Sequence, residues 1–167
     1  LPLSLANATF FTWLLEMGVL VVALSLLGSF VLPWLPLVAL FMVVFAIFAV
    51  GLSMIFSIIN VYFRDLSYLL TIVLQFWFYL TPVLYPVELV ATQSDTLGGL
   101  LGTPITMLDL YSLNPVEGFV EIFRNLLYDN RVPDLGTVLV ALAWTVSAFG
   151  VGAWMYSRKE KMLAELL

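Results

Sequence analysis

Residues 60–86 read NVYFRDLSYLLTIVLQFWFYLTPVLYP, and the architecture of the chain can be worked out from this stretch. Arg64 and Asp65 form a short polar connection between two long apolar runs, and the second run carries one amide, Gln75, among many aromatic side chains. No charged residue occurs in residues 17–63, 66–87 or 135–157. Each run is long enough to cross a hydrocarbon core of about 30 Å, which takes about 20 helical residues. Because the runs are continuously apolar rather than alternating, helices are predicted and not the strands of a barrel.

The composition of the chain is that of an integral membrane protein. Of its 167 residues, 63% are hydrophobic and 10% are charged, and its mean hydropathy is +1.10, whereas globular domains are about half apolar and a quarter charged. The absence of cysteine and histidine excludes disulfides, Cys/His zinc sites and histidine acid–base chemistry within this sequence. No phosphate-binding loop, metal cluster or nucleophile beside a base is recognisable, so we expect neither an enzyme nor a metal site. Because the sequence begins at Leu1 with an apolar run close behind, we expect that it lacks its natural N-terminus.

Four membrane spans are predicted from the apolar runs, over residues 8–31, 37–59, 66–85 and 135–156. Two prolines and a tryptophan in residues 32–36 predict a tight turn at the membrane surface. Asp65 is placed to cap the third span, and Pro82 should kink that span because it removes a backbone hydrogen bond. In the fourth span Ala148 and Gly152 are small residues four apart, which indicates close helix packing.

The charged residues predict how the chain is oriented. Residues 88–134 contain seven acidic and two basic residues, so this segment alone accounts for the net charge of −5. Arg64 lies in a short connection, and three more basic residues follow the last span in residues 158–161. Because basic residues favour the cytoplasmic side of short loops, we expect Arg64 and the C-terminus inside and residues 88–134 outside, as an extracytoplasmic segment.

Glu16 is the charged residue that falls inside a predicted span, and such a residue is a functional hypothesis by default. A position near the inner surface, or a partner outside this sequence, explains it equally well. Arg64 and Asp65, taken alone, are typical of a solvated turn.

The outer segment contains a strong helix start at residues 114–117, which read NPVE. Asn114 should cap the helix, Pro115 occupies the first helical position, and Glu117 should reach back to complete a capping box. The helix is expected to run to residue 128.

This outer helix has an apolar stripe at helical spacing, and Glu117, Glu121 and Arg124 lie on its other face. At about 14 residues it would be roughly 21 Å long, too short to cross a membrane. A shorter helix is expected over residues 103–110. Together the two would form a re-entrant or interfacial pair that enters the outer leaflet and returns, with protein covering its backbone.

Gln75 needs a partner inside an apolar span, so it should face protein or water rather than lipid. Phe78 and Tyr79 follow three and four residues later and share its helical face, whereas Trp77 points elsewhere. Aromatic faces stack on flat partners, so these residues are candidates for the path of a polar, ring-shaped cargo, with Trp77 the weaker member. Lipid-facing aromatics are the alternative, and Tyr85 is equally explained by an aromatic belt at the membrane surface.

Three motifs together resemble the permease subunits of ABC type 2 exporters. They are NVYFRD at 60–65, LQFWFYLTPVLYP at 74–86, and LNP with a later FR within 113–124, in this order and spacing. The branch that they resemble most exports polysaccharides and polyol phosphates, such as O-antigen, capsule and teichoic acid. The resemblance covers residues 1–167, as spans three to six of a six-span permease. It implies an all-α integral membrane domain of four transmembrane helices plus the outer helix pair.

The resemblance also implies a mechanism. The family forms a homodimeric channel driven by separate nucleotide-binding subunits, which would bind ATP and Mg²⁺, so no cofactor is expected in this chain and no nucleic acid partner. Its re-entrant helices form an outer gate, which would contain Asn114, Pro115, Glu117, Glu121 and Arg124, and channel aromatics contact sugars. The expected function is export of a lipid-linked glycan across the bacterial inner membrane. An ABC type 2 exporter of drugs or lipids is one alternative, and a membrane-embedded glycan polymerase or ligase is another from a different class.

Overall fold

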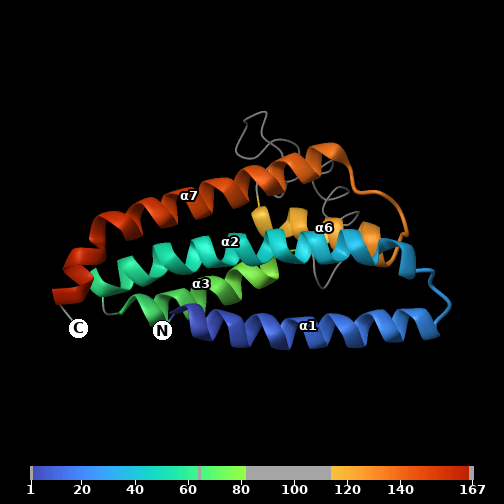
Figure 1. The fold of residues 1–167 in the computed structure, drawn as a ribbon, viewed down its shortest axis with the longest axis horizontal. Helices are drawn as coiled ribbons and strands as arrows, with labels where there is room; N and C mark the ends of the chain where they lie inside the picture. Colours follow the sequence, from blue (N-terminus) through green and yellow to red (C-terminus); the bar gives the residue numbers. More distant parts are fainter. Residues whose placement is uncertain (1, 64, 82–113, 166–167) are drawn as a thin grey trace, which may run out of the picture.

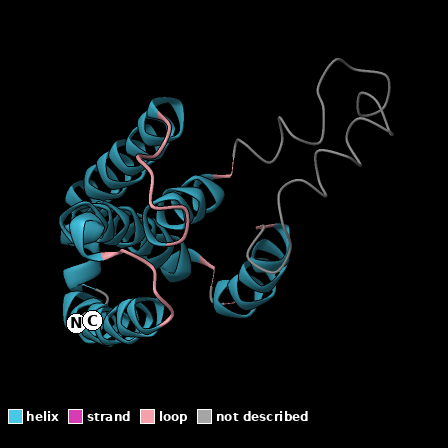
Figure 2. Cartoon of the chain, turned by 90° about the vertical axis from the view of Figure 1, so that its right-hand side faces the viewer, coloured by secondary structure: helices cyan, strands magenta, loops and turns pink. Residues whose placement is uncertain are grey.

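The computed structural model describes residues 2–63, 65–81 and 114–165, and this part of the chain is built from helices with no strand. Seen from its end, the described part of the chain is a bundle of helices (Figure 2). The elements are α1 (Pro2–Leu26), the short 3₁₀ helix η1 (Leu32–Trp34), α2 (Leu35–Tyr62), α3 (Leu66–Leu80), α6 (Pro115–Leu127) and α7 (Leu135–Glu165). The predicted all-helical class is confirmed for these residues, and the predicted helix over residues 103–110 lies outside them.

The helices run roughly along the long axis of the molecule, with α2 between α1 and α7 (Figure 1). The connections α1–α2 and α6–α7 lie at one end, and the connection α2–α3 lies at the other end with the C-terminus (Figure 1). This alternation is the one expected from the charges. Which end faces the cytoplasm stays a prediction.

Two helical stretches within the described residues are long and apolar enough to cross a membrane, Leu32–Tyr62 and Leu135–Arg158. Shorter apolar helices cover Phe11–Leu26 and Leu66–Tyr79. The structure is therefore consistent with an all-α membrane protein, and the total of four spans stays a prediction.

The first helix ends earlier than predicted. The apolar run continues to Val31, but α1 stops at Leu26 because Gly28 adopts a positive φ of 89°, which is accessible to glycine at little cost. The amide of Ser29 then donates to the carbonyl of Leu24 at 3.1 Å, the bond that closes a Schellman motif. The predicted helical end at residue 31 is wrong, because hydropathy alone does not register this stop.

The predicted boundaries of α3 are also partly wrong. Asp65 occupies the N-cap position as expected, but its side chain makes no capping hydrogen bond. At the other end α3 stops at Leu80, and Thr81 is extended with φ −91° and ψ 132°. A residue that precedes proline avoids the helical region, which accounts for the end of α3 at Leu80. The predicted kink at Pro82 lies outside the described residues. The remainder of the predicted span lies outside the described residues.

The last helix begins as predicted at Leu135, where the Asp134 carboxylate accepts a hydrogen bond from the Gly136 amide at 2.8 Å. It continues to Glu165, well beyond the predicted end at residue 156. Arg158 lies 4.7 Å from the centroid of the Trp154 ring, a cation–π contact. The predicted span agrees with the membrane-length stretch Leu135–Arg158, and the helix itself continues past the charges that end the apolar run.

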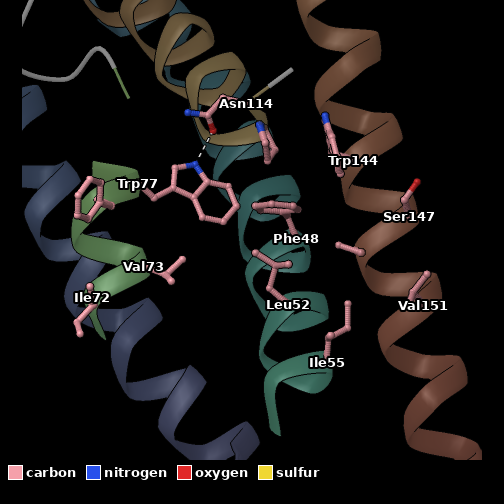
Figure 3. A pocket seen from close by; sticks show the side chains of 13 residues that line it. Phe48, Leu52, Ile55, Ile72, Val73, Trp77, Asn114, Trp144, Ser147 and Val151 are labelled. Carbon is pink, nitrogen blue, oxygen red and sulfur yellow. Dashed lines mark hydrogen bonds between the residues drawn. The ribbon is translucent and has the colours of Figure 1, made fainter. Parts of the chain in front are cut away.

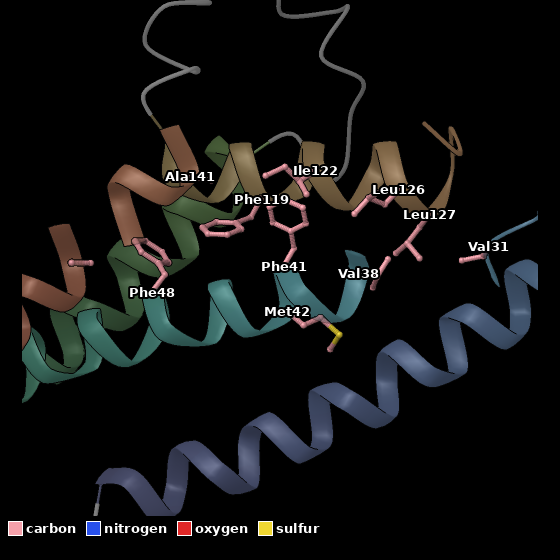
Figure 4. Packing of buried hydrophobic residues seen from close by; sticks show 11 residues of the cluster. Val31, Val38, Phe41, Met42, Phe48, Phe119, Ile122, Leu126, Leu127 and Ala141 are labelled. Atoms are coloured by element: carbon pink, nitrogen blue, oxygen red, sulfur yellow. The ribbon is translucent and has the colours of Figure 1, made fainter. Parts of the chain in front are cut away.

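The core lies between α2, α6 and α7. Phe45 and Phe48 of α2 meet Phe119 of α6, with ring centroids 4.9 Å and 5.7 Å apart. Figure 4 shows the buried apolar cluster, which includes Phe48 and Phe119, and Phe45 packs against it. α1 joins it through Trp13, whose ring lies 5.4 Å from that of Phe45. Of the stripe predicted on α6, Phe119 and Leu127 are buried, whereas Val116, Val120 and Phe123 are half-buried. The buried face also includes Ile122 and Leu126, so it is turned from the predicted one.

The tightest helix contact is between α2 and α7, at Gly51. A methyl group placed there would lie 2.5 Å from the backbone nitrogen of Phe149 and 2.6 Å from the carbonyl carbon of Ala148. A methyl group on Gly152 would lie 2.6 Å from the carbonyl oxygen of Gly51. The close packing predicted from Ala148 and Gly152 is confirmed, and the missing side chain on Gly51 is the other half of the contact.

Candidate functional site

An apolar groove lies between α3 and α7, with α2 forming its floor and the start of α6 closing one end (Figure 3). Its volume is about 740 Å³. The side chains around it are contributed by four helices, and they include Phe48, Leu52 and Ile55 of α2, Ile72, Val73, Phe76 and Trp77 of α3, Asn114 and Pro115 at the start of α6, and Trp144, Ser147, Ala148 and Val151 of α7. The groove is therefore almost wholly apolar, with its polar groups concentrated at the end formed by Trp77 and Asn114.

Asn114 is the hub of a hydrogen-bond network at this end of the groove. Its side-chain oxygen accepts from the backbone amide of Val116 at 3.1 Å and from the indole nitrogen of Trp77 at 2.7 Å. Its side-chain nitrogen donates to the hydroxyl of Thr81 at 3.0 Å. That hydroxyl donates in turn to the backbone carbonyl of Trp77 at 2.9 Å. One side chain thus caps α6 and joins it to the end of α3.

The sequence explains why Asn114 takes this place. It precedes Pro115 and has an extended backbone, with φ −74° and ψ 114°, as expected of a residue before proline and of a helix cap. Pro115 at the first helical position lacks an amide that would otherwise need a partner. The predicted cap of α6 is confirmed.

The other half of the predicted capping box is not made. Among the hydrogen bonds of the described residues, none runs from Glu117 back to the Asn114 amide. Burial, reinforced by the nearby charge of Glu121, raises the pKa of Glu117 from 4.5 to about 7, while Arg124 acts in the opposite direction. Glu121 itself accepts a hydrogen bond at 3.3 Å from Thr137 of α7. These carboxylates lie on the part of α6 that faces α7, and Glu121 connects the two helices.

The structure sorts the predicted substrate-path residues differently from the sequence. Gln75, Phe78 and Tyr79 are exposed, with the rings of Phe78 and Tyr79 in an edge contact at 5.8 Å, and none of the three lines the groove. Trp77, expected to matter least, is the half-buried residue that lines the groove and binds Asn114. Contact of any of them with a cargo stays a prediction, and Tyr85 lies outside the described residues.

Of the charged residues singled out in the first span and in the connection before α3, those that the structure describes do not line this groove. Asp65 is exposed at the start of α3, and Glu16 is exposed on α1. Arg64 lies outside the described residues.

A second polar contact, missed in the sequence, closes the other end of α6. Asn125 is buried, and its side-chain oxygen accepts a hydrogen bond from the Arg131 side chain at 2.7 Å. The Arg131 amide also donates to the Asn125 carbonyl at 2.9 Å, and Asp129 lies 3.4 Å from the Arg131 guanidinium. Asn130 between them has a φ of 50°, a left-handed conformation that asparagine tolerates better than most residues. The signal available in the sequence was an asparagine inside an otherwise apolar helical face.

Taken together, these observations describe an all-α bundle with membrane-length helices, an apolar lateral groove and a capped short helix. In sequence, the chain is similar to an export permease. Over 107 residues the chain is 32% identical to the O-antigen export system permease protein RfbA of Myxococcus xanthus. The matched region is 60% of this chain, and the chain spans 37% of the length of that curated relative. No family model matches the chain. No solved structure matches it.

Proposed function

We propose that this chain is the transmembrane part of a permease subunit in an ATP-driven ABC type 2 exporter. In this proposal the cargo is a lipid-linked polysaccharide or polyol phosphate, moved outward across the bacterial inner membrane. The observation that carries the proposal is the 32% identity to an O-antigen export permease over 107 residues. The two membrane-length helices and the apolar composition support a membrane transporter.

In the proposed exporter, a separate nucleotide-binding subunit binds ATP and Mg²⁺. Two copies of the permease form the channel. The end of the bundle that holds Asp65 and the C-terminus of α7 would face that subunit in the cytoplasm, because basic residues concentrate there. The opposite end, with the turn at residues 128–134, would face outward.

Two groups of residues acquire roles in this proposal. The exposed side chains of Gln75, Phe78 and Tyr79 would lie toward the cargo path, where an amide and aromatic rings suit a hydroxylated ring. α6 would act as an outer gate, since its 13 residues are too few to cross a membrane at 1.5 Å per residue. Asn114, Pro115, Glu117, Glu121 and Arg124 would set the position of that gate.

Deletion of the gene for the full-length permease in its source bacterium tests the function. If the permease exports the glycan, its deletion should remove glycan from the cell surface, and complete lipid-linked glycan should accumulate inside the cell. Inactivation of the cognate nucleotide-binding subunit should give the same phenotype. Surface glycan of unchanged amount would reject glycan export and favour a drug or lipid exporter, whereas glycan of altered chain length or linkage would favour a polymerase or ligase.

The orientation can be tested separately with single cysteines, because the chain contains none. Tyr128, at the C-cap of α6, and Ser157, in the C-terminal part of α7, are both exposed and lie toward opposite ends of the bundle. The test uses spheroplasts, in which the outer barrier has been removed and the inner membrane is intact. A cysteine at position 128 should react with an impermeant thiol reagent added to them, and one at position 157 should react only after the inner membrane is permeabilised. The reverse pattern would overturn the proposed orientation.

A further inference from the structure

Within the described part of the chain, α3 is held to the rest of the bundle by very little packing. Among its side chains at positions 66–79, only Leu66, Leu70 and Trp77 are even half-buried, and none is fully buried. The shorter α6, by contrast, buries seven residues against its neighbours. In a membrane, lipid tails are as apolar as the side chains, so helix association depends on close packing and on hydrogen bonds. With little packing available, the attachment of α3 depends on its hydrogen bonds.

Those hydrogen bonds are concentrated at one end of α3. Trp77 in its last turn donates to the Asn114 oxygen at 2.7 Å, and Thr81, at the C-cap, accepts from the Asn114 nitrogen at 3.0 Å. Thr81 is 2% exposed, so the interaction is shielded from solvent. Asn114 is itself fixed by the amide of Val116, and α6 is anchored by its buried face on α2 and α7. The network therefore fastens the loosely packed helix to the firmly packed part of the molecule.

We propose that Trp77, Thr81 and Asn114 form a latch that sets the width of the groove between α3 and α7. With the latch made, the end of α3 is held against the start of α6 and the groove has its observed volume. With the latch broken, α3 pivots about its N-terminal end, because within the described residues no fully buried side chain at positions 66–79 restrains it. The groove then changes width while α2, α6 and α7 keep their arrangement. This proposal concerns the conformation of the bundle and does not depend on the cargo.

The latch predicts a measurable shift in population. Loss of one typical intramolecular hydrogen bond changes a two-state equilibrium by about fivefold. Trp77→Phe removes the indole donor and keeps an aromatic ring in the groove. Thr81→Val removes the hydroxyl and keeps the side-chain shape. Each should raise the ratio of released to latched α3 by about fivefold or more relative to the parent.

Double electron–electron resonance on the full-length protein in lipid nanodiscs tests whether α3 is released when the latch is broken. One pair of spin labels, at Leu74 of α3 and Val146 of α7, reports the groove, since both side chains are exposed and neither lines it. A second pair, at Val43 of α2 and Val146, reports the firmly packed part. In Trp77→Phe and Thr81→Val the first pair should gain a second distance population, and the second pair should keep the parent distribution.

Trp144→Phe is the matched control. Trp144 lines the same groove from α7, and among the described residues its indole makes no hydrogen bond, so this variant should give the parent distribution in both pairs. Asn114→Asp keeps the oxygens that accept from Trp77 and Val116 but loses the donor to Thr81, so it should release α3 partially. The latch is rejected if Trp77→Phe and Thr81→Val match the parent. It is also rejected if both label pairs broaden equally, because the network would then stabilise the whole bundle rather than position α3.

Discussion

Alanine at Gly51 should force α2 and α7 apart at their tightest contact. The added methyl group would lie 2.5 Å from the Phe149 nitrogen and 2.6 Å from the Ala148 carbonyl carbon, whereas non-bonded carbon atoms prefer about 3.5–4.0 Å. Both neighbours are backbone atoms, so no side chain can rotate away, and the helices must separate locally by roughly 1 Å. Overpacking of this kind costs about 1–3 kcal/mol. Alanine is favoured over glycine in a helix by about 1 kcal/mol, which offsets only part of the cost.

Gly150→Ala is the matched control for this experiment. Gly150 lies in α7 between Phe149 and Gly152, which contact Gly51. A methyl group on Gly150 would nevertheless meet nothing within 4 Å. That variant should be neutral or more stable by up to about 1 kcal/mol. The measurement is reversible unfolding of the purified protein in mixed detergent micelles. Gly51→Ala should unfold at least about 1 kcal/mol more easily than Gly150→Ala, which corresponds to roughly 2–4 °C in the midpoint. Equal stabilities would refute the close approach of the two helices.

Three other changes test the ends and the buried face of α6. Asn114→Ala removes the cap, which is worth about 1 kcal/mol, and should speed hydrogen exchange at the Val116 amide; unchanged exchange would count against the cap. Arg131→Ala leaves the buried amide of Asn125 without its side-chain partner, at a cost of about 1–3 kcal/mol, and should make the turn at residues 128–134 more sensitive to limited proteolysis. The pKa of Glu117 is raised from 4.5 to about 7 in the folded state, so that state binds more protons in this window and stability should fall as pH rises through it. Glu117→Gln should flatten this slope in unfolding experiments between pH 4.5 and pH 7, and an unchanged slope would remove Glu117 as its source.

Features that depend on neighbours in sequence were predictable. The start of α6 follows from Asn114 and Pro115, since capping and the restriction on φ act within a few residues. Small residues four apart, Ala148 and Gly152, indicated close packing on one face of α7. The sequence could not name Gly51 as the partner, because that choice depends on where two helices cross.

The sequence analysis missed features that depend on contacts between residues far apart in the chain, or on the residue at which a helix ends. Trp77 and Asn114 are 37 positions apart, and Trp77 was judged only by its angle from Gln75 on the same helix. Gly28 was passed over because apolar residues follow it, although its positive φ ends α1. In each case hydropathy correctly located an apolar run, but it carries no information about the backbone angle or the side-chain partner that ends it.

α7 is one continuous helix whose path is longer than the hydrocarbon core of a bilayer is thick, although its last part bends away from the rest (Figure 1). Its 31 residues extend about 46 Å at 1.5 Å per residue, whereas a hydrocarbon core measures about 30 Å. If Leu135 marks one boundary of that core, the other falls near Trp154, and the remaining turns from there to Glu165 stand clear of the lipid tails. A displacement applied to these last turns would be transmitted along a hydrogen-bonded helix, because α7 continues without a break to Glu165. It would reach Gly152, within one turn of the boundary, and through it the backbone of α2, so that the crossing point of the two helices works as a fulcrum.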